Sequence, residues 1–108
     1  MAADYCVVMI TAPDEAEAAR LGRFLVEQEL AACVQTMPIN SVYRWAGALQ
    51  ADSEVLMLAK TRSALLDELV ERLTQEHSYD VPEIITVPII SGAAGYLRWV
   101  SEQTTPSS

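Results

Sequence analysis

The sequence is poor in basic residues, and it contains a single His and a single Lys among 108 residues. Seven Lys and Arg stand against fifteen Asp and Glu, which gives a formal net charge of −8. Proteins that bind nucleic acids place basic side chains against phosphates, so this balance opposes nucleic-acid binding. Cations are the ligands that the composition favours.

Residue types that form redox, soft-metal and catalytic motifs are also scarce. The two cysteines, Cys6 and Cys33, lack C-x-x-C spacing, and the four methionines form no M-x-x-M cluster that could relay copper. The sequence has no G-x-S-x-G, no phosphate-cradling glycine loop and no H-E-x-x-H. We therefore expect a protein that is not an enzyme.

Long apolar runs are missing as well. No stretch approaches the roughly 18 apolar residues of a membrane span, and no basic n-region precedes the first apolar run. These features predict a cytoplasmic protein without a membrane partner.

The longest patterned stretch, residues 41–61, predicts one β-hairpin. Aromatic and β-branched residues enter a turn at 46–48, and an apolar return strand follows over 54–59. Gly47 can take the positive φ of a tight reversal. The hairpin divides the chain into two halves of similar design.

The first half begins with an apolar run, Tyr5–Ile10, which predicts a central strand. Pro13 suits a first helical position, and Asp14 and Glu15 suit the positive end of a helix dipole, so we expect a helix to start here. Its predicted buried stripe falls at i, i+3, i+4 and i+7, on Ala18, Leu21, Gly22 and Leu25.

A second strand is predicted from residues 30–34 through Pro38 to the hairpin. Because Pro38 cannot donate to a β-ladder, we expect this strand at a sheet edge. The predicted strand order is 4-1-3-2, which separates Cys6 from Cys33 and predicts two free thiols.

In the second half, Ser63 is the predicted N-cap of a helix over 64–76. A last strand over 84–87, a short helix over 96–100 and a flexible tail over 104–108 follow. The predicted buried stripe of the helix over 64–76 is Leu66, Leu69, Val70 and Leu73.

The element order is β-α-β-β-α-β, a ferredoxin-like split βαβ fold of the α+β class in a single domain over residues 1–103. Both helices of such a fold cover one sheet face. The strands are nevertheless apolar at successive positions, over 7–10, 55–59 and 84–87, so the second face is also apolar. The simplest cover for it is another copy of the chain.

His77 lies at the end of a predicted helix, beside carboxylates. As a cation it can stabilise the helix dipole, or its ring can bind copper, nickel or zinc. A tight site needs about three or four ligands. Oxygen ligands from Glu76, Asp80 or Glu83, or groups of a second subunit, would have to complete it.

Lys60 and Cys33 each have two interpretations, and Trp45 and Trp99 have one. Lys60 is either a snorkelling charge or a contact for an anionic ligand. Cys33 is more often a small buried hydrophobe than a thiolate nucleophile. Trp45 and Trp99 are large apolar anchors, which are typical of interface centres, so we expect both in a subunit interface.

Six segments, taken in order, resemble the motifs of the CutA family, which is named for divalent-cation tolerance. They are Thr11–Glu15, Leu30–Val34, Tyr43–Gly47, Asp52–Val55, Lys60–Arg62 and His77–Glu83, and Tyr96–Trp99 is similar to the family's C-terminal motif. The resemblance covers nearly the whole chain. It implies a ferredoxin-like protomer in a tight homotrimer, with hairpins that pair between subunits in an assembly similar to that of the PII signalling proteins.

The resemblance also implies binding sites. The family's binding of copper and other divalent metals is linked to a His motif, which carries onto His77 alone, since Ile10 and Glu76 stand where some members have Cys and His. Copper is thus the expected cofactor, with His77 and Glu83 as the expected ligands. A cleft between subunits is implied as well, lined by Cys33, Tyr43, Trp45, Lys60, His77, Tyr79, Glu83 and Trp99.

Two functions follow from this reading. The first is a trimeric divalent-cation tolerance protein that binds copper or other divalent ions in the response to metals. The alternative is a PII-like trimeric signalling or scaffolding protein, which binds a small ligand or a protein partner in the cleft and for which metal binding is incidental.

Overall fold

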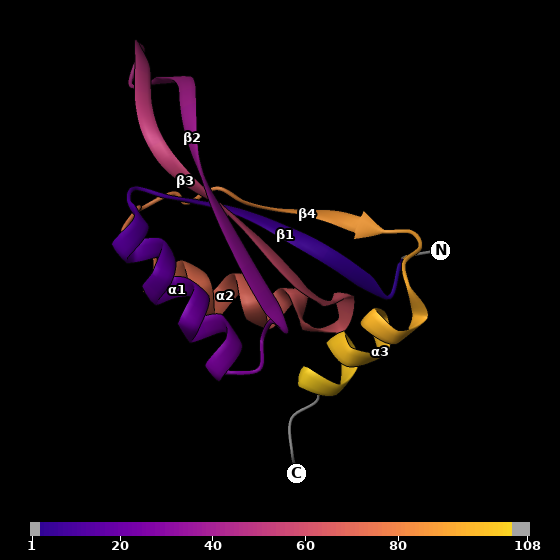
Figure 1. Ribbon diagram of the computed structural model, residues 1–108. Coiled ribbons are helices and arrows are strands. Elements are labelled where there is room, and N and C mark those ends of the chain that lie inside the picture. Colours follow the sequence, from indigo (N-terminus) through magenta and orange to yellow (C-terminus); the bar gives the residue numbers. More distant parts are fainter. Residues whose placement is uncertain (1–2, 105–108) are drawn as a thin grey trace.

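The structure, a computed structural model, describes residues 3–104 of the chain. Four strands form one sheet, and three α-helices and a short 3-10 helix pack on it (Figure 1). The elements are β1 (Tyr5–Ala12), α1 (Glu15–Glu27), β2 (Cys33–Trp45), β3 (Ala48–Arg62), η1 (Ser63–Leu65), α2 (Leu66–Glu76), β4 (Ile84–Ile89) and α3 (Ala94–Gln103).

The sheet is antiparallel throughout, with the order β2-β3-β1-β4. This order confirms the predicted 4-1-3-2 arrangement and places Pro38 on an edge strand. Free thiols at Cys6 and Cys33 are confirmed too. The fold is therefore the α+β, ferredoxin-like fold that the element order predicts.

α1 and α2 lie together on one face of the sheet (Figure 1). The main core forms between these two helices and the sheet. β1 alternates along its length, so that Cys6, Val8 and Ile10 point into this core. Leu21 and Leu25 of α1 meet them from the helical layer, which is the pattern expected of an amphipathic helix.

The other side of the sheet, which we call the open face, carries the alternate residues of each strand. Met37 lies opposite Leu56 across β2 and β3, and Met9 lies between Leu58 and Ile85. The exposed fraction of Met37 is 46% and that of Ile85 is 52%. The predicted second apolar face is confirmed, and α1 and α2 leave it uncovered.

The β2–β3 hairpin extends well beyond the rest of the sheet (Figure 1). Its strands pair continuously from Cys33 opposite Lys60 to Trp45 opposite Ala48. The turn itself is Ala46-Gly47, with φ of 51° and 80°. Two consecutive positive φ angles give the turn the handedness that matches strand twist. The expected turn over 46–48 is thus one residue shorter, because Ala48 already pairs within β3.

Two helix starts differ from the prediction. Asp14 is the N-cap of α1 and its carboxylate accepts from Glu17 N–H at 2.8 Å, so Pro13 lies before the helix rather than in its first position. Ser63 begins η1 and donates its hydroxyl hydrogen to the Ala3 carbonyl instead of capping α2, whose N-cap is Leu65. In the second case the 3-10 turn η1 intervenes, so Ser63 lies two residues ahead of the N-cap position of α2.

Burial differs at two predicted positions. Leu69 and Leu73 of α2 are buried, whereas Val70 is 38% exposed, because the stripe of this helix that meets the sheet is narrower than the apolar pattern. Thr104, expected in a flexible tail, is fully buried. Its carbonyl and hydroxyl accept from Arg62 at 2.7 and 3.0 Å, which fastens the end of α3 to β3. Residues 105–108 lie outside the described part.

The two thiols are predicted to differ in reactivity. Burial raises the pKa of Cys6, whose side chain is 1% exposed, whereas Cys33 is half-buried on the open face. Iodoacetamide at mildly alkaline pH should leave Cys6 unmodified in the native protein and alkylate it in guanidinium. The Cys33→Ser variant is the control, and native alkylation of Cys6 at the rate of the unfolded chain would contradict the prediction.

Candidate functional site

A groove lies where the hairpin leaves the sheet, and it encloses about 720 Å³. Its walls come from the end of β1, from the hairpin and from the segment 78–83 between α2 and β4. We call it the hairpin groove, and its lining residues are Thr11, Ser41, Val42, Tyr43, Trp45, Glu54, Ser78, Tyr79, Asp80, Val81 and Glu83.

Two tyrosines of the hairpin groove donate to carboxylates of β3. The Tyr79 hydroxyl donates to Glu54 Oε2 at 2.9 Å, and the Tyr43 hydroxyl donates to Asp52 Oδ2 at 2.5 Å. Burial, followed by the Glu54 hydrogen bond, raises the pKa of Tyr79, and the hydrogen bond to Asp52 raises that of Tyr43. Both phenols are therefore protonated and act as hydrogen-bond donors in the protomer.

Glu83 and Asp80 are exposed at the mouth of this groove. The Glu83 carbonyl accepts from Thr11 N–H at 3.4 Å, which ties the segment 78–83 to the end of β1. Glu83 and Asp80 thus line the same groove as Glu54 from a segment whose backbone is anchored to the sheet, and both are open to solvent.

His77 lies behind this segment, and its side chain is completely buried. Nε2 is 2.7 Å from the Thr11 carbonyl oxygen, and Nδ1 accepts from Tyr79 N–H at 3.1 Å. Since a carbonyl only accepts and an amide N–H only donates, these bonds select the neutral tautomer with its proton on Nε2. Glu17 Oε2, 3.5 Å from Nδ1, accepts from the Ser78 amide and hydroxyl.

The predicted cleft residues form two separate sets within one protomer. Tyr43, Tyr79 and Glu83 belong to the hairpin groove, whereas Cys33 and Lys60 face each other at the opposite end of the β2–β3 ladder. Cys33 and Tyr43 are ten residues apart on β2, which corresponds to about 33 Å of extended strand. One protomer therefore does not assemble the predicted cleft.

The second set belongs to the start of β2 and the last residues of β3, and α3 packs against β3. α3 lies at the end of the sheet far from the tip of the hairpin (Figure 1). Lys60 donates to the Gln35 side-chain carbonyl. Burial raises the pKa of Tyr96, and the neighbouring Cys33 adds to this shift. The rings of Tyr96 and Trp99 are 5.6 Å apart. Trp99 is 39% exposed and Trp45 is 57% exposed, so both predicted interface anchors are available to a partner.

Three residues that matter here were missed by the sequence reasoning: Glu54 and Asp52, which hold the tyrosines, and Glu17, which approaches His77. Glu54 and Asp52 on β3 lie on the same face of the hairpin as Tyr43 on β2. A strand register predicted for the hairpin would therefore have identified both carboxylates as neighbours of the tyrosine. The Glu17 contact joins α1 to the end of α2, and no local signal marks it.

The described side chains of one protomer do not form a tight metal site. Among residues 3–104, no three or more His, Cys, Asp or Glu side chains converge on a point where they could hold a metal ion. Both ring nitrogens of His77 already have hydrogen-bond partners. The described residues of one protomer therefore do not fit a tight metal site, which requires about three or four converging ligands.

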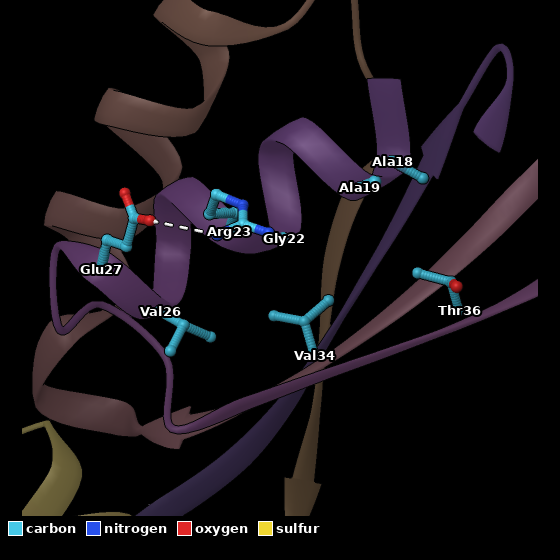
Figure 2. A pocket seen from close by; sticks show the side chains of 8 residues that line it. All are labelled: Ala18, Ala19, Gly22, Arg23, Val26, Glu27, Val34 and Thr36. Carbon is cyan, nitrogen blue, oxygen red and sulfur yellow. Dashed lines mark ion pairs between the residues drawn. The ribbon is translucent and has the colours of Figure 1, made fainter. Parts of the chain in front are cut away.

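A second, shallower hollow of about 470 Å³ lies between α1 and the edge strand β2 (Figure 2). The small side chains of Ala18, Ala19 and Gly22 face Val34 and Thr36 across it. A Cβ at Gly22 would lie 3.4 Å from Val34 Cγ1, so glycine permits the close approach of helix and strand.

In the described part of the chain, no helix combines the length and the apolarity that crossing a bilayer requires.

Comparisons with known proteins place the chain and its fold in a family context. Protein CutA of Arabidopsis thaliana, a chloroplastic protein, is 44% identical over 99 residues, which cover 91% of this chain and 54% of that protein. The chain thus spans about half the length of this plant relative. The divalent-cation tolerance protein CutA of Thermus thermophilus is 44% identical over 99 residues, which cover 91% of this chain and 96% of that protein.

The solved structure of the periplasmic divalent cation tolerance protein CutA from Archaeoglobus fulgidus superposes with a TM-score of 0.92 at 38% identity, over 94% of this chain and 99% of that one. Residues 6–103 match the family model described as CutA1 divalent ion tolerance protein. The resemblance drawn from the sequence motifs is confirmed, and the chain belongs to the CutA1 divalent ion tolerance protein family.

Proposed function

We propose that this protein acts in the response to divalent metal ions as a homotrimer that binds copper or another divalent cation through the hairpin groove. The observation that carries the proposal is that two exposed carboxylates, Glu83 and Asp80, line this groove together with Glu54. A protein of net charge −8 attracts cations. The family membership and the names of its relatives agree with this role.

Glu83 is the proposed first metal ligand. His77 can join it only after its ring leaves the buried position and gives up its bonds to Thr11 and Tyr79. Binding by one protomer should therefore be weak, and groups of a neighbouring protomer would be needed for tight binding. We propose binding rather than catalysis, because the tyrosines of the groove are committed to hydrogen bonds.

The proposed trimer rests on the open face. Its half-buried and exposed side chains form one apolar surface across all four strands: Val7, Met9, Met37, Leu56, Leu58, Ile85 and Val87. Both β2 and β4 are edge strands of the protomer. A head-to-tail contact joins the β2 edge of one protomer to the β4 edge of the next, and it gives a ring when the rotation between protomers closes. A two-fold contact would instead pair the same edge of both protomers. Trp45 and Trp99 are proposed interface anchors, and the assembly is proposed to be PII-like.

The cytoplasm is the proposed location. Both cysteines are free, and structural thiols persist most readily in a reducing compartment.

Copper titration by calorimetry tests the metal function. The wild type should show saturable binding with a defined stoichiometry, and Glu83→Gln should weaken it about tenfold, because a charged ligand is lost. Glu71→Gln, which removes an equal charge from the exposed side of α2, is the matched control and should change little. The same weak curves for all three proteins would contradict the proposal.

The separation of the predicted cleft residues favours a second candidate, a signalling or scaffolding trimer. The Cys33–Lys60 set and the Tyr43–Tyr79 set can meet only if different protomers contribute them. Under this proposal a small ligand or a protein partner binds between subunits, and metal binding is incidental. Diffuse copper binding that is insensitive to Glu83→Gln, in a protein that is still trimeric, is the result it predicts.

A further inference from the structure

The segment 78–83 between α2 and β4 has few backbone hydrogen bonds to the rest of the protomer. In the described part of the chain, its backbone meets other backbone at its end, where the Thr11 N–H donates to the Glu83 carbonyl at 3.4 Å. Just before the segment, the His77 N–H donates to the Leu73 carbonyl at 2.9 Å. The bond at Glu83 is long for a backbone hydrogen bond. Side chains therefore determine how the start of this segment lies against the protomer.

Glu17 of α1 makes two of these side-chain attachments. Its Oε2 accepts from the Ser78 N–H at 3.1 Å and from the Ser78 hydroxyl at 2.8 Å, and it lies 3.5 Å from His77 Nδ1. The Glu17 side chain is only 13% exposed. Hydrogen bonds to an ionised acceptor are about twice as strong as those between neutral groups. The first residue of the segment is thus held to the first turn of α1.

The sequence around Glu17 indicates a different, local role for this residue. Asp14 and Glu17 have the spacing of a capping box, in which the glutamate bonds back to the amide of the N-cap residue. Asp14 does cap α1, since its carboxylate accepts from the Glu17 N–H at 2.8 Å. Glu17 Oε2, however, bonds to Ser78, which is 61 residues further along the chain. This oxygen therefore holds a distant segment and does not cap its own helix.

Arg20, one turn further along α1, contacts the last residue of α2. Its guanidinium donates to the Glu76 carbonyl at 2.8 Å and lies 3.6 Å from the Glu76 carboxylate. Because α2 has no basic residue in its own last turn, Arg20 supplies the cation that favours the negative end of its dipole. Both side chains of this pair are about half exposed, so the pair is weakened by solvent. Glu17 makes the better shielded of the two contacts.

We propose that Glu17 is a positioning residue, which fixes the segment 78–83 and thereby sets where the segment presents Asp80 and Glu83. The choice of ligand rests on the proposed function, in which Glu83 binds a divalent cation. The Glu17 contacts all join atoms of one chain, so they do not depend on how open the groove is. A segment that is ordered before the cation arrives need not be ordered on binding, and this raises affinity.

Hydrogen exchange and a calorimetric copper titration of the assembled protein test this role. Glu17→Ala should speed amide exchange in the segment 78–83 about tenfold, because Ser78 loses a charged acceptor, while the amides of β1 exchange as in the wild type. It should also weaken copper binding about fivefold, since the segment must then be ordered on binding. Glu17→Gln keeps an oxygen that accepts from Ser78, so it should retain most of the protection and of the affinity.

A charge control and two readouts keep this proposal apart from the metal function. Glu15→Gln removes an equal charge from the exposed side of the same first turn and should change neither exchange nor copper binding. A wild type that binds no copper, with a segment that Glu17→Ala still frees, contradicts the metal function and supports the hold of Glu17 on the segment. The positioning role is overturned if Glu17→Ala exchanges as slowly as the wild type or binds copper equally well. It is overturned also if Glu17→Gln is as impaired as Glu17→Ala.

Discussion

Replacing Ile85 by Glu is expected to convert the proposed trimer into folded monomers. Ile85 is 52% exposed in the protomer, so the new charge has water available when the chain is alone, and a change at such a position rarely costs the fold more than about 0.5 kcal/mol. In the proposed trimer the same carboxylate would be buried against apolar side chains. An unpaired buried charge costs several kcal/mol, and each ring would contain three of them.

Sedimentation at micromolar protomer concentration measures the outcome. The wild type should have three times the 11.8 kDa mass of the chain, and Ile85→Glu should have the mass of one chain. Thr86→Glu is the matched control, because the next residue of β4 points to the other face and is also exposed. A monomeric wild type, or an Ile85→Glu variant that remains trimeric, would refute our account of the open face.

Replacing His77 by Ala is expected to lower stability far more than it lowers copper affinity. The Thr11 carbonyl and the Tyr79 amide would lose their partners in a buried place, and a cavity would replace the ring. Unsatisfied buried groups cost about 1 to 3 kcal/mol each, so a loss of roughly 2 to 4 kcal/mol per protomer is a conservative expectation.

Urea unfolding at a fixed protomer concentration measures this loss, since the stability of an oligomer depends on concentration. His77→Gln should recover part of the stability, because its amide N–H can reach towards the Thr11 carbonyl. The copper titration should change less for His77→Ala than for Glu83→Gln. Unchanged unfolding together with abolished copper binding would instead identify His77 as a metal ligand and reverse our interpretation.

Much of the fold could be read from periodicity. The continuous apolar run of β1 and the helical spacing of Leu21 and Leu25 are local patterns of the chain, and they predict a buried strand and an amphipathic helix. The alternating burial along β1 was visible only in the structure. The edge position of Pro38 follows from its missing N–H. Helix starts were less predictable, because the 3-10 turn η1 precedes α2 and Ser63 donates to the Ala3 carbonyl.

The candidate site was only partly predictable. Motifs identified Tyr43, Tyr79, Glu83 and His77 as candidate functional residues, but they do not state which atom bonds to which. The Tyr79 hydroxyl and the His77 Nε2 have their hydrogen-bond partners on other elements. The hydrogen bond from Tyr79 to Glu54 depends on how the segment 78–83 packs against the hairpin. Such contacts are set by the packing of the whole protomer.

The sequence by itself determined the element order, the strand order, the free thiols and the apolar open face, because side-chain polarity at a fixed period specifies which surfaces must be buried. The tertiary structure alone decided that Thr104 is buried under Arg62 and that His77 lies inside with both nitrogens occupied. It also decided that the predicted cleft residues occupy two distant ends of the sheet. A polar side chain satisfies its hydrogen bonds with whichever partner the fold brings within reach, and that choice is not encoded in its neighbours along the chain.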